Sequence, residues 1–411
     1  MINLSNFVDV NINYKITSSI TSTRDTAVLI KTHTAPTASA QPSTKNVLTT
    51  FGKGENAVEA LVTTYTEIPV NDAKTEGQVT YKDVNYVAEG DPLYYYYSMF
   101  FQNGGQKLMV ISVEGANTSV LTKADLTTIV KALDYKYVVI TSTINYSDMN
   151  DLASAINGDT SVNGCYQKKF ITHITEAEYA DEHFDITTIK KVENYAIKYG
   201  LAGIEMTMAA YLTQIDIDDY ASVKDYAFTI EKVSYSYKDG DVTTVVGEAY
   251  SDNDLVTELM EANINVDGEL VNAVRVLGGN DFGGGEFVNY YMLILLHQTL
   301  TERLVGVLTQ KLKYNPQGLS IIGSAIGTEL DRYVNCGYIS TNDAWTDDSL
   351  YYQGNLIISK NTLLPLGYKY VVMPFSTLSE TDRQEHKLPK IFVLISDGYS
   401  VRKIEIVGEV F

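Results

Sequence analysis

The sequence predicts an α+β protein in which strands at both termini flank two long helices, with an α/β domain inserted between them. Three observations support this class. Apolar and polar residues alternate with a period of two over 6–16 and 401–411, which is typical of half-buried strands. In the middle of the chain, continuous apolar runs alternate with amphipathic helical patterns, which indicates a mostly parallel sheet covered on both faces. Two later segments repeat apolar residues every four positions.

The 411 residues are enough for two or three domains. We expect four parts along the chain. Residues 1–50 would be an N-terminal strand arm and linker, 51–220 an α/β domain, 221–285 connecting strands with a helix and a glycine-rich loop, and 286–411 a C-terminal domain with a terminal strand arm. The linker is rich in Thr, Ser and Ala, and one short apolar strand at 27–30 interrupts it.

An aromatic run in residues 91–105, "DPLYYYYSMFFQNGG", predicts a short helix packed in a core. Asp91 is placed to cap it, Pro92 to occupy its first position, and Asn103-Gly104 to end it. The α/β pattern then continues to residue 205. We expect strands at 107–113, 136–141, 168–174 and 201–205, and helices starting at Thr122 and Ser147 and spanning about 186–199.

Beyond Tyr220 the pattern changes to a hairpin with its turn at Asp239-Gly240, followed by a helix over about 253–262. A glycine-rich loop leads to the two long helices, and Ser320 is expected to cap the second. Residues 353–411 read as strands, with one at 390–396. The two apolar series of the long helices are Leu296, Leu300, Leu304, Leu308 and Leu312, and then Ile322, Ile326, Leu330 and Val334 before Gly337.

The chain is acidic, with a formal net charge of −20. This charge argues against nonspecific binding to nucleic acid or to an anionic membrane surface. The two cysteines, Cys165 and Cys336, are too few and too isolated for a disulfide framework or a zinc site, which suits a reducing cytosol. No secretory leader opens the chain, and charged residues interrupt its longest apolar stretch before it could span a bilayer.

No catalytic, cofactor-binding or metal-binding constellation stands out, so we expect a protein that is not an enzyme and carries no cofactor. "GGNDFGGGEF" lacks the lysine and hydroxyl residue of a phosphate loop. "GLSIIGS" has Ile322 where a nucleophile elbow needs its second glycine. His173 and His183 have neither the spacing nor the companions of a zinc site.

The C-terminal region carries a more specific signal. "HQTLTERLVGVLTQKLKYNPQGLSIIGSAIGTELDRYVNCGYIS" resembles the two-helix region of contractile phage tail sheath proteins. "HKLPKIFVLISDGYSVRKIEIVGEVF" resembles the closing strand pair of that family, and "FVDVNINYKITSS" its first strand. The resemblance covers roughly the first 30 residues and 280–411, while the middle matches only in the order of its elements.

The resemblance implies a subunit that polymerises in stacked hexameric rings around an inner tube, and that contracts to drive the tube through the host envelope. Terminal strands would extend to neighbouring subunits and complete their sheets. Residues 17–50 and the loop 278–285 would serve as hinges or as simple connections. The residues implied in strand exchange are Val8, Val10, Ile12, Ile404, Ile406 and Val410. The candidates for contact with the tube are Arg303, Lys311, Lys313 and Arg332.

The implied partners are further copies of the chain, a tail tube protein, and baseplate and tail terminator proteins, with no nucleic acid and no direct insertion into a membrane. The implied location is the virion, after assembly in the host cytoplasm. Two alternatives remain open at this stage. The chain could be the sheath of a bacteriocin or another contractile injection machine, or an α/β enzyme with an unrecognised site.

Overall fold

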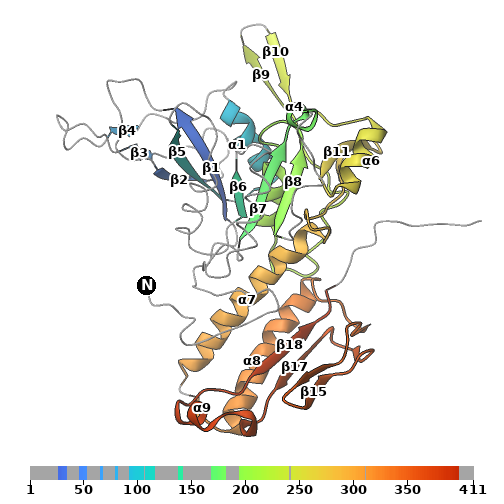
Figure 1. Ribbon diagram of the computed structural model, residues 1–411. Helices are drawn as coiled ribbons and strands as arrows, with labels where there is room; N and C mark the ends of the chain where they lie inside the picture. The colour runs from blue at the N-terminus through green and yellow to red at the C-terminus, as the bar shows by residue number, and fades with distance from the viewer. Residues whose placement is uncertain are drawn as a thin grey trace, which may run out of the picture. The chain divides into compact units, whose positions relative to one another are not determined.

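The structure of the protein, a computed structural model, contains both helices and strands, as the α+β prediction requires (Figure 1). It describes residues 26–34, 46–52, 65–67, 79–81, 92–105, 107–115, 138–141, 168–181, 194–239, 242–310 and 312–397. The described residues form two compact units. The α/β unit comprises those up to 215 and 225–291, and the C-terminal unit comprises 216–224 and 292–397.

A six-stranded sheet forms the centre of the α/β unit (Figure 1). Five strands run parallel to their neighbours, and only the edge strand β2 is antiparallel to its partner β5. The predicted, mostly parallel sheet is therefore confirmed. In sheet order the strands are β2 (Asn46–Gly52), β5 (Lys107–Gly115), β1 (Thr26–Thr34), β6 (Val138–Thr141), β7 (Lys169–Ile174) and β8 (Tyr195–Tyr199).

The strand predicted at 27–30 is confirmed and is longer than expected. As β1 it lies between β5 and β6, and Ala27, Val28 and Leu29 are fully buried. Apolar burial on both faces explains why this short segment joins the sheet although the sequence around it reads as a solvated connection. The four-part division of the chain otherwise stays a prediction.

Two predictions near residue 200 are wrong. The helix predicted over about 186–199 is wrong at its end, because residues 195–199 form β8, whose five residues are all buried. The strand predicted at 201–205 is also wrong, because these residues form turns, with Gly200 at φ +146° and Gly203 at φ +109°. A short apolar run fits both a buried strand and a buried helix, and here its pairing with β7 decides the outcome. The helices expected from Thr122 and Ser147 lie outside the described residues.

The predicted aromatic helix is confirmed as α1 (Pro92–Gln102). It packs against α5 (Met206–Thr213), and four of its aromatic side chains are buried. Gly104, at φ +87°, follows its end, and the side chain of Asn103 donates hydrogen bonds to the carbonyl oxygens of Met99 and Lys232. The buried aromatic residues of α1 are Tyr95, Tyr96, Phe100 and Phe101.

Smaller elements complete the α/β unit. The predicted hairpin near residue 240 is confirmed by the antiparallel pairing of β9 with β10. A second hairpin pairs β11 with β12. The elements are β3 (Tyr65–Glu67), β4 (Val79–Tyr81), α4 (Glu176–Tyr179), β9 (Tyr235–Asp239), β10 (Val242–Val246), α6 (Asn253–Glu261), β11 (Val266–Leu270) and β12 (Ala273–Leu277).

Both predicted long helices are present. They are α7 (Phe287–Leu308), whose residues from Met292 belong to the C-terminal unit, and α8 (Pro316–Asn335). Ser320 does not cap α8, because the helix starts one turn earlier. The side chain of Asn315 accepts a hydrogen bond from the backbone N–H of Gly318, and a proline at the first position suits the start of a helix.

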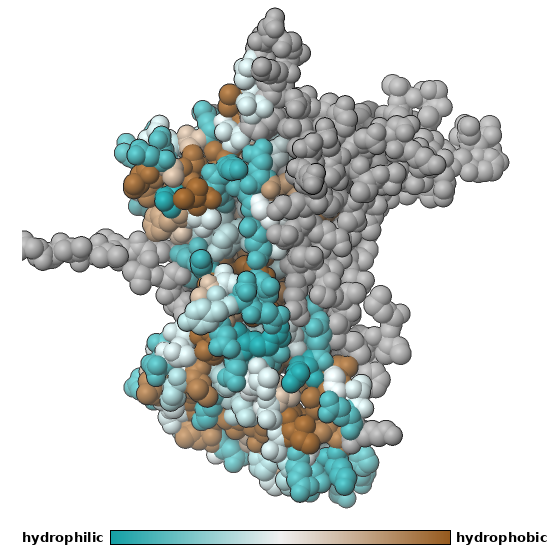
Figure 2. Space-filling model, turned by 180° about the vertical axis from the view of Figure 1, so that it is seen from behind, coloured by the Kyte–Doolittle hydropathy of each residue, from teal (hydrophilic) through white to brown (hydrophobic). Residues whose placement is uncertain are grey.

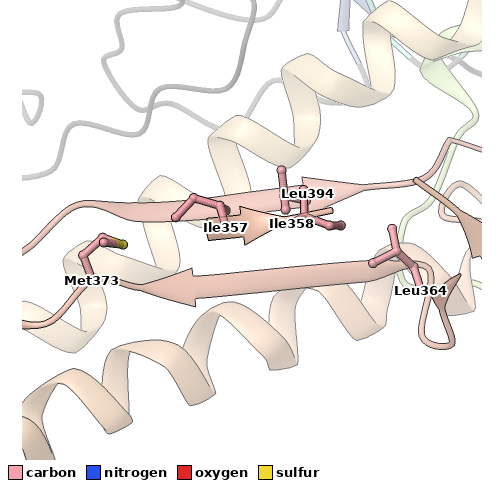
Figure 3. Packing of buried hydrophobic residues seen from close by; sticks show 5 residues of the cluster. All are labelled: Ile357, Ile358, Leu364, Met373 and Leu394. Carbon is pink, nitrogen blue, oxygen red and sulfur yellow. The ribbon is translucent and has the colours of Figure 1, made fainter. Parts of the chain in front are cut away.

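Short antiparallel strand pairs follow α8 in the C-terminal unit. Their buried side chains form an apolar cluster of Ile357, Ile358, Leu364, Met373 and Leu394 (Figure 3). The side chain of Trp345 packs against this cluster. The elements are β13 (Asp343–Ala344), β14 (Leu350–Tyr352), β15 (Asn355–Ile358), β16 (Leu363–Leu364), β17 (Tyr368–Val372), η4 (Phe375–Thr377), α9 (Glu380–Gln384) and β18 (Ile391–Ile395).

Candidate assembly surface

The strand pair β17–β18 is the first feature that could join one copy of the chain to another. The strands pair antiparallel over five positions, from Tyr368 opposite Ile395 to Val372 opposite Ile391. Among the described residues, no further strand pairs with the outer edge of either one. Such an edge presents backbone N–H and C=O groups in the geometry that another strand needs. A ladder of two strands alone is only marginally stable in water.

Contacts with α8 hold β17 in place. The hydroxyl of Tyr368 donates a hydrogen bond to Oδ1 of Asp331 at 2.7 Å. Burial raises the pKa of this phenol, and the carboxylate of Asp331 raises it further. The ring of Tyr370 lies against Gly323 and Gly327, where a Cβ atom would come within 3.0 Å and 3.3 Å of it. The two helical glycines therefore let the strand approach α8 closely.

The described residues end at Asp397, two positions after β18. The backbone N–H of Ser340 donates to the carbonyl of Ser396 at 2.9 Å, and the N–H of Ser396 donates to the carbonyl of Gly367 at 2.7 Å. Asp397, the last described residue at this end, forms a β-bridge with Ile339. The strand-exchange residues predicted from the sequence all lie outside the described residues. They are Val8, Val10, Ile12, Ile404, Ile406 and Val410.

A groove between α7 and α8 is the second feature. Small residues keep it open, and a Cβ atom at Gly306 would meet nothing within 4 Å. The exposed side chain of Arg303 lines the groove, and among the described residues it has no ion-pair partner. Its full lining is Glu302, Arg303, Gly306, Val307, Gln310, Ile321, Ser324, Ala325 and Thr328.

The structure describes three of the four predicted tube-contact residues, Arg303, Lys313 and Arg332, and their surroundings differ. Arg332 binds acidic side chains of its own unit, with Nε 2.9 Å from Oδ1 of Asp218 and a terminal nitrogen 2.6 Å from Oε1 of Glu329. Burial lowers the pKa of this guanidinium, but the hydrogen bond to Asp218 and the two carboxylate charges raise it overall. Lys313 is exposed and has no ion-pair partner among the described residues, and Lys311 lies outside them.

Sequence reasoning missed a buried ionic cluster in the α/β unit. Lys198 of β8 contacts the carboxylate of Glu231 and lies 2.9 Å from Oδ2 of Asp267. Its Nζ also donates hydrogen bonds to the hydroxyl of Thr207 at 2.6 Å and to that of Tyr226 at 3.0 Å. All five side chains are buried. Burial lowers the pKa of Lys198, but the two carboxylates outweigh this effect and raise it.

Two further buried pairs connect β7 to segments outside the sheet. Lys169 contacts Asp281 of the glycine-rich loop, and Nδ1 of His173 lies 3.0 Å from Oε1 of Glu205. Burial lowers the pKa of His173, but the charge and hydrogen bond of Glu205 raise it overall. The sequence does contain one signal of these pairs, which is a charged or titratable residue inside an otherwise apolar strand. Nothing in the sequence indicated which acidic residue each one would meet.

The glycine-rich loop 278–285 is firmly anchored, so it does not support the hinge that the sequence suggested. The side-chain oxygen of Asn265 accepts hydrogen bonds from the backbone N–H groups of Gly279 at 2.7 Å and Asn280 at 2.9 Å. The N–H of Phe282 donates to the carbonyl of Tyr195 at 2.7 Å. Hydrogen bonds and an ion pair thus fix the loop within the α/β unit.

Within the described ranges, no group of three or more His, Cys, Asp or Glu side chains is placed to hold a metal ion. In the same ranges, no helix is long and apolar enough to cross a membrane. Cys336 is a buried free thiol.

Residues 288–410 match the family model described as "E217 tail sheath protein gp31-like, C-terminal domain". This part of the chain is therefore a tail sheath C-terminal domain. The matched region contains β17–β18 and the groove between α7 and α8, and it confirms the resemblance seen in the C-terminal sequence. A search of curated proteins finds no match to the chain.

Solved structures resemble this chain over nearly its whole length. The contracted sheath of PVC, an extracellular contractile injection system, has a TM-score of 0.52 at 11% identity, covering 98% of this chain and 96% of that one. The contracted helical sheath of the anti-feeding prophage has a TM-score of 0.49 at 13% identity, covering 98% and 97%. At such low identities the likeness shows a similar fold and nothing more. The conclusion rests on the PVC sheath, whose TM-score is above 0.5.

Proposed function

We propose that this chain is the structural subunit of a contractile sheath, which polymerises around an inner tube and contracts to drive the tube through an envelope. The single observation that carries the proposal is the match of residues 288–410 to a tail sheath C-terminal domain. The likeness of the whole chain to the fold of the PVC sheath supports it. A two-helix domain packed on strands, with an inserted α/β domain, is the arrangement we propose for the subunit.

We propose that copies are linked by strand addition at β17–β18. Support comes from the outer edges of this pair, which no described strand occupies, and from the 14 residues that follow Asp397. Each added backbone hydrogen bond contributes a net ~0.5–1.5 kcal/mol, while ordering a residue costs ~1–2 kcal/mol. Apolar burial must therefore favour the exchange. The side chains that would supply it are Val8, Val10, Ile12, Ile404, Ile406 and Val410.

For contact with the tube we rank Arg303 and Lys313 ahead of Arg332. Both are exposed and have no ion-pair partner within the described part of the chain, so their charges are available to an acidic partner. The charge of Arg332 is already balanced by Asp218 and Glu329. A tube bearing carboxylates that face the groove between α7 and α8 would suit this arrangement.

The further partners in this proposal are baseplate and tail terminator proteins, and the particle would be assembled in the host cytoplasm. A phage tail and an injection machine are both compatible with it, because the matching family model describes a tail sheath protein and the PVC sheath belongs to a contractile injection system. In either case the assembled sheath would be part of a virion or of an extracellular particle.

Negative-stain electron microscopy of the purified full-length chain, beside a variant that lacks residues 403–411, tests the proposal. We expect tubes or stacked rings from the full chain and none from the truncated one. Monodisperse monomers from both, with equal thermal stability, would contradict strand exchange. The failure of the full chain to assemble, even with its tube protein present, would contradict the sheath function itself.

A further inference from the structure

The β11–β12 hairpin of the α/β unit and the segment 228–231 beside it display apolar side chains to solvent. Residues 228–231 run along β12. The backbone N–H of Phe228 donates to the carbonyl of Val276 at 2.8 Å, and the N–H of Glu231 donates to that of Val274 at 3.1 Å. Ile230 pairs with Arg275, which is opposite Gly268 of β11.

Four exposed apolar residues cluster on this surface around one arginine, and we call the five residues the outer patch. Ile230 is 61% exposed and Val271 is 82% exposed. Phe228 and Leu270 are each 40% exposed. A terminal nitrogen of Arg275 donates to the carbonyl of Phe228 at 2.8 Å. Figure 2 shows apolar side chains gathered on this side of the unit, at the upper left of the view.

The backbone of the outer patch is strained. Phe228 has φ +62° and Val271 has φ +53°, in a left-handed region that bulky and β-branched residues rarely adopt. Val271 and Asn272, at φ +57°, form the turn of the β11–β12 hairpin, a position where asparagine and glycine are usual. The left-handed backbone at Val271 therefore lowers folding stability. Burial of the side chain does not offset this cost, because the side chain is 82% exposed. Strain of this kind is concentrated at functional positions.

The charges around the outer patch indicate its partner. Arg275 has no ion-pair partner among the described residues, and neither do the exposed Asp254 and Glu261 on α6 of the same unit. Helix α6 has no basic residue in its last turn and an acidic one in its first. Each copy has a net charge of −20, so two copies repel each other over most of their surfaces. An apolar surface that carries the charge of Arg275 lets a second copy approach with less repulsion.

We propose that the outer patch binds the acidic face of α6 on a second copy of this chain. Apolar side chains at the hairpin tip are buried against the neighbour, and Arg275 pairs with its Asp254 or Glu261. The contact is heterologous, because different surfaces of the two copies meet, and such contacts build open arrays. This inference rests on the proposed sheath function, and it adds a contact that does not depend on the terminal strands.

A pair of matched substitutions tests the apolar part. Val271→Asn removes the side chain and places at this turn a residue that tolerates a left-handed backbone. We expect its melting temperature to be unchanged or higher, and the protein concentration that gives half-maximal pelleting of assemblies to rise on the order of tenfold. The control, Val245→Asn, alters a valine that is 65% exposed on β10 outside the patch. Its assembly should match that of the wild type.

A charge reversal tests the partner. Arg275→Glu should weaken assembly, and a chain that also carries Asp254→Lys and Glu261→Lys should assemble better than Arg275→Glu alone. If the wild type assembles and Val271→Asn assembles equally well, the patch makes no contact and this inference is wrong. A second copy that uses a surface other than α6 would leave the reversal without rescue, which also overturns the proposal as stated. A wild type that never assembles would instead count against the sheath function.

Discussion

The hydroxyl of Tyr368 lies 2.7 Å from Oδ1 of Asp331, which ties strand β17 to helix α8. Tyr368 is also opposite Ile395 of β18, so this bond positions the strand pair whose edges we assign to assembly. The same strand places the ring of Tyr370 against two glycines of α8. The helix thus sets where the open edges of β17–β18 are presented.

Removing that hydrogen bond with Tyr368→Phe should lower the free energy of unfolding of the C-terminal unit by about 0.5–1.5 kcal/mol. Trp345 is the only tryptophan, and it packs against the core of this unit, so its fluorescence during urea unfolding reports on it. The matched control is Tyr351→Phe, because Tyr351 is 62% exposed. Equal effects of the two substitutions would contradict a stabilising role for the bond.

Replacement of the buried cation by Lys198→Met should destabilise the α/β unit by about 3–5 kcal/mol, because it leaves the carboxylates of Glu231 and Asp267 buried without a counter-charge. Lys360→Met removes an exposed ion pair with Asp348 and should cost at most ~1 kcal/mol. Hydrogen exchange measures each effect in its own unit, in peptides covering 194–215 for Lys198→Met and 343–373 for Lys360→Met. Adding Glu231→Gln and Asp267→Asn to Lys198→Met should recover part of the loss, and no recovery would argue against the electrostatic explanation.

The stability of the α/β unit should decrease as pH rises above about 6.5, the ordinary pKa of histidine. In the folded protein the pKa of His173 is raised, because the charge and hydrogen bond of Glu205 outweigh the effect of burial. A raised histidine pKa contributes stability that is fully present below the unfolded pKa and is lost as pH passes through the folded one. Hydrogen exchange at a series of pH values, corrected for the intrinsic exchange rate, should show this loss.

The variant His173→Asn should flatten that pH dependence. The control His386→Asn alters an exposed histidine of the C-terminal unit and should leave the dependence unchanged. An unaltered slope in His173→Asn would mean that another group titrates.

Replacing Arg332 or Arg303 by alanine should change the stability of the C-terminal unit by different amounts. Arg332→Ala leaves Glu329, whose side chain is 5% exposed, without its partner, and should destabilise the C-terminal unit by about 1–3 kcal/mol. Arg303→Ala removes an exposed charge and should change stability by less than ~0.5 kcal/mol. Urea unfolding followed by Trp345 fluorescence distinguishes them. A large loss in Arg303→Ala would mean that this residue supports the fold and is not free for a partner.

The sequence by itself determined the elements that repeat a local pattern. The leucine series predicted α7, and "DPLYYYYSMFFQNGG" predicted α1 with its end at Asn103-Gly104. The apolar runs predicted the mostly parallel sheet, and the C-terminal segments predicted the sheath resemblance. Such signals lie within a few turns or one strand, because periodicity records which face of a single element is buried.

Only the tertiary structure decided the features that depend on residues far apart in the chain. Residues 195–199 became a strand because β7 pairs with them. Arg332 forms a hydrogen bond with Asp218, which is 114 positions away, and Lys169 with Asp281, which is 112 positions away. The strained turn at Val271 exposes a valine where local preference would place asparagine or glycine. A charge in the sequence carries no record of its partner, since folding selects that partner by three-dimensional proximity.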